Sequence, residues 1–363
     1  MEIFLSLAVL YSVLILFFFL GLHSPKAQKN TTINKISIIV AARNEAENLP
    51  KLLNRLTSQN YPTEKYEIII CDDRSDDNST AIIKEFQSEN PNLQLIQIKE
   101  EDPKILGKKG AITTAVKASK YDILAFTDAD CQPSVNWLQE INKHFPEDVD
   151  FVAGYSTIQH ENKFFGLMKN LERSAIFAVI AGAFGFNWGI TATAGNMAYR
   201  KKLFDEVNGF EGIGHIRSGD DDLMLHKMWK FIRNLRFMFS TDSIVVTQGC
   251  ADVQQQINQE TRRGSKWKIY PFSIKLVTLL VMLFYISYIL LLLFTILGSY
   301  TWCFFGIVTF LKIVPEFLLT FSFLLKVKNL KYLQVFPIAE IIYIPYFIFF
   351  GLKGTFGKYR WKE

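Results

Sequence analysis

The sequence predicts an α/β domain on a mostly parallel, Rossmann-like sheet, with transmembrane helices at both ends of the chain. Two observations carry this prediction. Between about residues 35 and 248, short apolar runs rich in β-branched residues alternate with amphipathic stretches of helical spacing. On either side of this region lie apolar runs of about 20 residues, the length that crosses ~30 Å of hydrocarbon.

The first half of the α/β region divides into alternating strands and helices. Four strands are expected, at 36–42, 66–71, 93–98 and 123–127. Three helices are expected between them, at 46–58, 78–88 and 110–118.

Four apolar segments are long enough to span a membrane: 3–22, 276–297, 302–325 and 333–352. Lys26, Lys29 and Lys35 follow the first segment, whereas Glu2 precedes it, so the positive-inside tendency predicts a cytoplasmic α/β domain. We therefore expect an anchor at 1–23, a cytoplasmic domain at 35–268 and a membrane region at 275–353.

If each of the four apolar segments crosses the membrane in turn, the basic tail, 353–363, lies on the outer side. Either the tail is an exception to the tendency, or one of the last segments does not cross. Lys312, Glu316 and Glu340 lie at membrane depth, where ionisable groups face the bundle interior and pair. They could line a polar path for an acceptor or polymer; a structural ion pair is the favoured interpretation.

The net charge of +5 and the pI near 8.8 reflect lysines and arginines that flank the apolar segments and suit anionic headgroups. No basic stripe points to nucleic acid. The four cysteines are scattered without metal-ligand spacing, as expected for reduced thiols rather than a disulfide framework.

Polar side chains follow three of the predicted strands. They are Arg43-Asn44-Glu45, Asp72-Asp73, and the pair Asp128 and Asp130. The carboxyl ends of parallel strands form the ligand crevice of such a sheet, so these groups should converge. Two carboxylates two residues apart suit a hard divalent cation held against a diphosphate.

Four motifs follow one another in a fixed order: IIVAARNE at 38–45, DDRSDDNST at 72–80, GKKGAI at 107–112 and DAD at 128–130. Together they resemble the membrane-bound branch of the inverting family 2 glycosyltransferases, which includes polysaccharide synthases and ceramide glucosyltransferases. The similarity covers about residues 37–266. It implies a GT-A fold, a nucleotide-diphosphate sugar as donor, with a UDP-sugar favoured, and Mg²⁺ or Mn²⁺.

The resemblance and the residue chemistry assign a donor site. Asp130 is expected to bind the metal, and Asp128 to reach the ribose or the metal through water. The remaining donor contacts are expected from Arg43, Glu45, Asp73 and Lys108. Asp76 is expected to cap the following helix, and Lys109 to be solvated surface.

The second half should supply the acceptor side and a general base. Gly195-Asn196 resembles the family segment that borders the acceptor, and Asp220, Asp221 and Asp222 resemble the region that holds the base. Inversion needs one carboxylate to take the acceptor proton. The alignment allows either Asp220 or Asp221 as the base, and Asp220 is preferred. Asp222 is expected on the acceptor side. Adjacent carboxylates repel, which raises a pKa toward the range of a base.

Gln259 and Arg262 occupy the family's Q-x-x-R-W segment, in which Arg263 replaces the tryptophan. The resemblance implies that Gln259 and Arg262 approach the donor diphosphate, which a guanidinium suits. The aromatic stretch 164–188 predicts a core or interfacial helix, or alternatively a surface that binds a lipid acceptor.

We therefore expect a glycosyltransferase that uses a lipid or lipid-linked acceptor at the cytoplasmic face of a membrane, such as a bacterial inner membrane. A processive polysaccharide synthase is the alternative. It is less favoured because only three spans follow the domain and because Arg263 replaces the tryptophan. A nucleotidyltransferase would lack the base in the second half. A protein of a different class, which binds nucleotide sugars without transferring them, is the remaining alternative.

Overall fold

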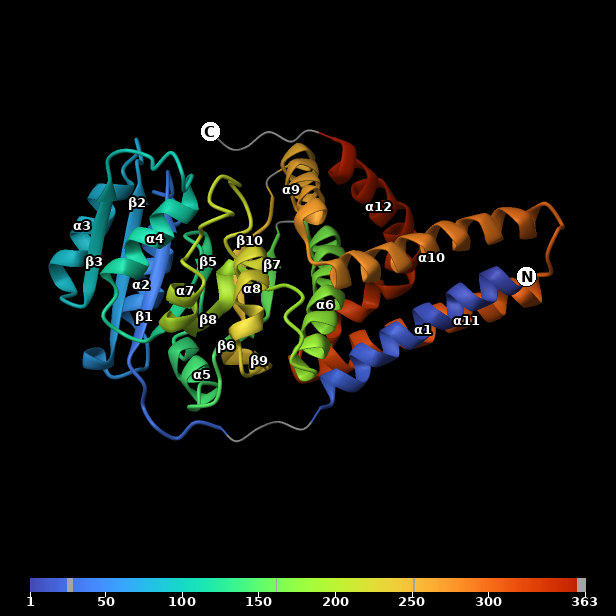
Figure 1. The fold of residues 1–363 in the computed structure, drawn as a ribbon, viewed down its shortest axis with the longest axis horizontal. Helices are drawn as coiled ribbons and strands as arrows, with labels where there is room; N and C mark the ends of the chain where they lie inside the picture. The colour runs from blue at the N-terminus through green and yellow to red at the C-terminus, as the bar shows by residue number, and fades with distance from the viewer. Residues whose placement is uncertain (25–28, 161, 251, 358–363) are drawn as a thin grey trace. The chain divides into compact units, whose positions relative to one another are not determined.

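The computed structural model describes residues 1–24, 29–160, 162–250 and 252–357 (Figure 1). Lys26 and the basic tail residues Lys358, Arg360 and Lys362 lie outside the described residues. The chain forms two compact units, which we describe separately. The helical unit comprises Met1–Ser24, His160–Phe186 and Gly249–Glu363, and the α/β unit comprises Pro25–Gln159 and Asn187–Gln248.

The α/β unit contains a seven-stranded sheet of order β3-β2-β1-β4-β8-β6-β9. Its strands are β1 Ile36–Ala42, β2 Tyr66–Asp73, β3 Leu93–Ile98, β4 Ile123–Phe126, β6 Phe151–Gly154, β8 Met197–Arg200 and β9 Leu235–Met238. Only β8 runs antiparallel to its neighbours, so the prediction of a mostly parallel sheet is confirmed. A second sheet has the order β5-β10-β7, with β5 Cys131–Gln132, β7 Ser156–Gln159 and β10 Val245–Gln248.

Helices pack on the sheet because their apolar residues recur at helical spacing. In α2, Leu49–Thr57, the buried positions are Leu49, Leu52, Leu53 and Leu56. The other helices of this unit are α3 Ser79–Glu89, α4 Lys108–Ala118, α5 Trp137–Lys143, α7 Lys201–Glu206 and α8 Asp222–Met228, with short 3₁₀ turns η1 Thr63–Lys65, η2 Ala194–Asn196, η3 Trp229–Phe231 and η4 Thr241–Ser243.

The strand register determines which polar residues meet. Ala42 at the end of β1 pairs with Asp72 on β2, so the loops after both strands start side by side. Phe126 at the end of β4 pairs with Met197, the first residue of the antiparallel β8. The segment that follows β4 therefore lies beside the segment that precedes β8, and this is the edge at which the predicted site residues gather.

The helical unit consists of α1 Glu2–Leu22, α6 Lys163–Gly185, α9 Val253–Ser265, α10 Phe272–Ile296, α11 Trp302–Lys326 and α12 Phe336–Phe356, with 3₁₀ turns η5 Lys266–Ile269 and η6 Leu330–Val335. Among the described residues, four helical segments are long and apolar enough to cross a membrane: 2–22, 272–296, 302–326 and 330–356. Residues 160–186 and 249–268, expected in the α/β domain, cluster with these helices instead.

Glycines allow α1 and α6 to pack closely. A Cβ added at Gly21 would collide with the backbone of Gly182, and one added at Gly182 would collide with the backbone of Phe18. Small residues permit such an approach between apolar helices. Farther along the membrane segments, Lys312 lies 2.7 Å from Glu316 and also pairs with Glu340. The ion pair expected from the sequence is thus present.

Candidate active site

The site is organised around one lysine that joins two acidic segments of the α/β unit. The Lys108 Nζ atom lies 2.5 Å from Asp128 Oδ1 and 2.6 Å from Asp220 Oδ2. Lys108 is the first residue of α4 and follows Gly107, whose φ of +56° favours glycine. Asp128 follows β4, and Asp220 lies just before α8. The structure therefore brings together three residues that the sequence assigned to donor binding and catalysis.

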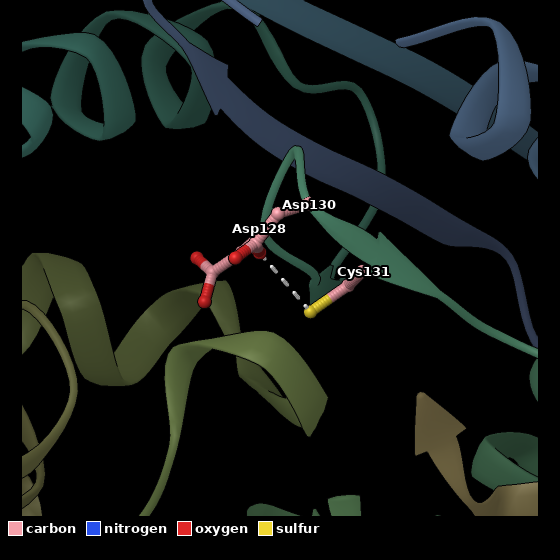
Figure 2. A group of neighbouring side chains, drawn as sticks. All are labelled: Asp128, Asp130 and Cys131. Carbon is pink, nitrogen blue, oxygen red and sulfur yellow. Dashed lines mark hydrogen bonds between the residues drawn. The ribbon is translucent and has the colours of Figure 1, made fainter. Parts of the chain in front are cut away.

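Asp128, Asp130 and Cys131 form a compact group of potential ligand atoms, all within 4.8 Å of one another (Figure 2). The Cys131 thiol donates to Asp130 Oδ1 over 3.6 Å, and Thr247 on β10 donates to Asp130 Oδ2 over 3.4 Å. Desolvation raises the pKa of both aspartates, and the charge of Glu45 raises that of Asp130 further. Glu45 therefore belongs to the same electrostatic site.

The donor set of this group fits a hard divalent cation. Two carboxylates can supply oxygen ligands, and a cation between them would relieve their mutual repulsion. Burial raises the pKa of the Cys131 thiol far above its usual range, so the sulfur stays protonated and is a poor ligand. The remaining positions around a cation would then be available to diphosphate oxygens.

A second polar network lies beyond the end of β2. Arg74 Nε donates to Asp73 Oδ1 over 2.9 Å, and the Arg74 guanidinium lies 3.3 Å from Glu101. Glu101 Oε1 in turn accepts from the backbone N–H of Gly107 over 2.8 Å, directly before Lys108. Asp73 is thus held in place and connected to the loop that presents Lys108. Sequence reasoning missed Arg74 and Glu101, since no motif marks the pairing of two loops.

The neighbouring loop shows that one capping prediction was wrong. Asp77, not Asp76, accepts from the backbone N–H of Ser79, the first residue of α3, over 2.9 Å. Asp77 also accepts from Ala46 N–H over 3.0 Å, which ties the loops after β1 and β2 together. Asp76 instead donates its own N–H to Asn44 Oδ1.

The expectation for Lys109 was also wrong. This side chain is completely buried, and its ammonium donates to the Ile213 carbonyl over 2.8 Å and lies 5.5 Å from the centre of the Phe210 ring. Burying a lysine is costly unless it is paired and hydrogen-bonded. Lys109 therefore anchors the 210–213 segment, while Lys108 beside it faces the acidic site.

The acceptor-side residues divide into two kinds. Asn196 is completely buried, accepts from Trp137 Nε1 over 3.0 Å, and donates to the carbonyls of Tyr155 and Ser243 over 2.8 Å. This geometry makes Asn196 a support of the local backbone. Its neighbour Gly195 faces the acidic group, because an added Cβ would lie 3.3 Å from Asp128 Oδ2.

The three adjacent aspartates have different surroundings. Asp221 is the N-cap of α8: its carboxylate accepts from Asp222 N–H over 2.7 Å and from Ala194 N–H over 3.3 Å. Asp222 is buried and accepts from Leu223 N–H over 2.7 Å. Asp220 forms the ion pair with Lys108 and has a side-chain exposure of 13%.

Three further predicted donor contacts remain predictions. Arg43 lies after β1 and its side chain is exposed. Gln259 and Arg262 lie on α9 of the helical unit, where Gln259 accepts from the Cys250 thiol over 3.7 Å.

Comparison with known proteins shows what this chain is similar to. Residues 37–207 match the family model described as glycosyl transferase family 2. A solved mannosyltransferase from Pyrobaculum calidifontis, in complex with GDP-Man and Mn²⁺, superposes with a TM-score of 0.56 at 15% identity, covering 97% of this chain and 98% of that one. That level of identity speaks for the fold alone. Residues 37–207 thus carry the glycosyl transferase family 2 domain, the fold is of the GT-A type, and the chain also contains apolar helices of membrane-spanning length.

Curated relatives match parts of the chain. Glycosyltransferase AglE of Haloferax volcanii is 35% identical over 133 residues, which is 36% of this chain and 42% of the relative. A beta-monoglucosyldiacylglycerol synthase of Trichormus variabilis is 29% identical over 180 residues, 48% of this chain and 37% of the relative. A poly-beta-1,6-N-acetyl-D-glucosamine synthase of Staphylococcus aureus is 28% identical over 148 residues, 40% and 34% respectively. The matches thus span less than half the length of these relatives.

Proposed function

We propose that the protein transfers a hexose, with inversion, from a nucleotide-diphosphate sugar to a lipid or lipid-linked acceptor at the cytoplasmic face of a membrane. The observation that carries this proposal is the bridge that Lys108 makes between Asp128 and Asp220. It joins the candidate metal and diphosphate site to the candidate base. A transfer reaction needs both within reach of one anomeric carbon.

On the donor side, Asp73, Glu45 and Arg43 follow two neighbouring strands and would contact the nucleoside, with a UDP-sugar as the favoured donor. Asp130 and Asp128 would hold Mg²⁺ or Mn²⁺, which would offset the charge of the departing diphosphate. The ammonium of Lys108 would form an ion pair with the diphosphate and so release Asp220. Gln259 and Arg262 would approach the same diphosphate from α9.

Asp220 is the better candidate for the general base. It would take the proton of the acceptor hydroxyl as that oxygen attacks the face of the sugar opposite the diphosphate, which gives inversion. Asp220 is paired with the ammonium of a lysine side chain, which a diphosphate can draw away, whereas Asp221 accepts backbone hydrogen bonds at the start of α8. A carboxylate held by two backbone N–H groups is less free to turn toward an acceptor hydroxyl.

The lipid acceptor is supported by two facts. Four helical segments of this chain are apolar and long enough to cross a membrane, and one relative is named as a synthase of a glucosylated diacylglycerol. The alternative, a processive polysaccharide synthase, is favoured by the relative named as a poly-N-acetylglucosamine synthase. The product separates them, because a processive enzyme yields chains of many sugars.

The experiment uses the full chain purified in detergent, with UDP- and GDP-sugars, Mn²⁺, and release of nucleotide measured with and without lipid extract. We expect release with at least one donor that depends on the lipid and on the metal, and that EDTA abolishes. The variants Asp130→Asn and Asp220→Asn should both abolish release. Donor binding without release from any donor would instead identify a protein that binds nucleotide sugars without transferring them.

A further inference from the structure

A cavity of about 300 Å³ lies inside the helical unit. Helices α1, α6, α10, α11 and α12 line it, together with Gln256 of α9. Most of its wall is apolar, including Ile15, Val179, Leu319 and Phe347. Its volume falls at the lower end of ligand pockets, roughly 300–1,000 Å³. Its location among helices of membrane-spanning length makes a lipid the natural occupant.

One polar end of this cavity is built on α6 and α9. Lys169 Nζ lies 2.6 Å from Glu172 and 3.6 Å from Glu260, and it donates to the Tyr346 hydroxyl over 2.9 Å. Gln256 Nε2 donates to Glu260 over 2.8 Å. The ammonium of Lys169 is therefore already paired with two carboxylates.

The other polar group lies near the middle of the membrane segments. Lys312 pairs with Glu316 and Glu340, and Tyr11 donates its hydroxyl to Glu316. The Tyr11 and Tyr285 hydroxyls lie 3.2 Å apart. The rings of Tyr285, Tyr343 and Tyr346 contact one another in sequence and connect the two polar ends. Ionisable groups at this depth mark functional sites or structural pairs.

The balance of charge decides which lipid fits. The two polar ends hold four carboxylates, Glu172, Glu260, Glu316 and Glu340, against three cations: Lys169, Lys312 and Arg263, whose guanidinium lies 3.2 Å from Glu260. A phosphate would need a cation, and each of these three cations is already paired with a carboxylate. A carboxylate accepts hydrogen bonds and donates none, so it prefers a hydroxyl group over another anion.

We propose that this cavity binds an uncharged, hydroxylated lipid and discriminates against lipid phosphates. The hydroxyl groups donate to the carboxylates, and the upper part of the acyl chains packs against the apolar wall. That this lipid is the acceptor rests on the proposed function, whereas its binding does not.

The test compares two probes with the same acyl chains that differ only at the third glycerol carbon, which carries a hydroxyl group in 1,2-dioleoylglycerol and a phosphate in 1,2-dioleoylphosphatidate. Native mass spectrometry of the full chain, released from detergent, measures the affinity of each. We expect saturable binding of dioleoylglycerol, tighter than that of the phosphatidate by about tenfold or more. Equal or tighter binding of the phosphatidate, or no saturable binding of dioleoylglycerol, would overturn the proposal.

Adjacent residues of α12 provide a matched steric control. Ile342 lines the cavity, whereas Ile341 is 76% exposed and does not. Ile342→Trp should weaken dioleoylglycerol binding by about tenfold, and Ile341→Trp should leave it unchanged. Equal effects of both substitutions would place the lipid outside the cavity.

A charge variant tests selectivity without blocking the cavity. The double variant Glu172→Gln/Glu260→Gln frees Lys169, so phosphatidate should gain affinity relative to dioleoylglycerol. The control Glu206→Gln/Glu211→Gln removes two exposed carboxylates of the α/β unit and should change neither affinity. Unaltered selectivity in the first variant would contradict the charge argument.

Transfer assays with the same variants separate this proposal from the proposed function. If dioleoylglycerol binds as expected but no donor supports transfer to any lipid, the proposed function fails and the binding site stands. If transfer to dioleoylglycerol occurs with a KM that Ile342→Trp does not alter, the proposed function stands and the assignment of this cavity fails.

Discussion

The ammonium of Lys108 lies 2.6 Å from the carboxylate of Asp220, although the two residues belong to different halves of the α/β unit. The positive charge of Lys108 therefore lies between the segment after β4 and the segment before α8. In the proposed reaction, an anion that binds Lys108 would release Asp220 from this ion pair.

Substitution of Lys108 tests this exchange. Lys108→Ala should lower kcat/KM by roughly two orders of magnitude, about 2.7 kcal/mol at the transition state. Both donor affinity and turnover should suffer, because the diphosphate loses its cation and the carboxylates Asp128 and Asp220 lose their counter-charge. Steady-state release of nucleotide measures the effect. Lys104→Ala, an exposed lysine in the same loop region, should retain full activity.

The two base candidates predict different outcomes. Asp220→Asn should abolish transfer while donor binding, measured by calorimetry, persists. Asp221→Asn should retain measurable transfer and near-native stability, because asparagine caps a helix about as well as aspartate, whereas Asp221→Ala should lower stability by about 1 kcal/mol. Thermal unfolding of these variants completes the comparison. Abolished transfer in Asp221→Asn alone, with normal stability, would reassign the base.

Gly195 should be sensitive to a single methyl group. A Cβ there would lie 3.0 Å from Cys131 Sγ and 3.3 Å from Asp128 Oδ2, tighter than ordinary contact. We expect Gly195→Ala to raise the Mn²⁺ concentration needed for half-maximal activity several-fold, since it displaces Asp128. Adding Cys131→Ala makes room beside the new methyl group and should restore part of the metal affinity. A double variant no better than Gly195→Ala would mean that the sulfur contact is irrelevant.

Acid stability should depend on Asp150, which is completely buried beside Arg233 and Lys202. Burial opposes ionisation, but hydrogen bonds from Arg233 and Lys202 outweigh it and hold the pKa at about 2. The unfolded value is about 3.9, so the stabilisation is complete above about pH 4 and is lost as the pH falls toward 2. Melting temperatures between pH 2 and 5 measure this loss. Asp150→Asn should flatten the profile in that window and lower stability at neutral pH.

Strands β1, β2 and β4 were predicted nearly to the residue because they are buried, which requires a continuous apolar run. The edge strand β3 was also predicted, although it is partly exposed and contains two glutamines. Strands β1 and β3 begin and end as expected, and β2 extends two residues farther, to Asp73. The short strands β5, β6 and β8 have no such signal. They are defined by pairing with distant segments, such as β8 with β4, rather than by local composition.

The site was predicted where a motif carries the chemistry and missed where two loops meet. Asp128, Asp130 and Lys108 converge as expected. The burial of Lys109 depends on the carbonyl of Ile213, about a hundred positions away, which no local pattern reveals. No local pattern reveals the contacts of Arg74 with Asp73 and Glu101 either.

The tight glycine contact between α1 and α6 has a consequence for how the chain can be divided. Helix α6 interrupts the α/β unit in sequence, between β7 and β8, and yet packs backbone to backbone against α1, near the N-terminus of the chain. A fragment trimmed to residues 29–248 to obtain soluble protein would keep α6 and lose its partner. It would present a bare, glycine-lined apolar face to water, and should aggregate unless α6 is also excised and replaced by a polar linker.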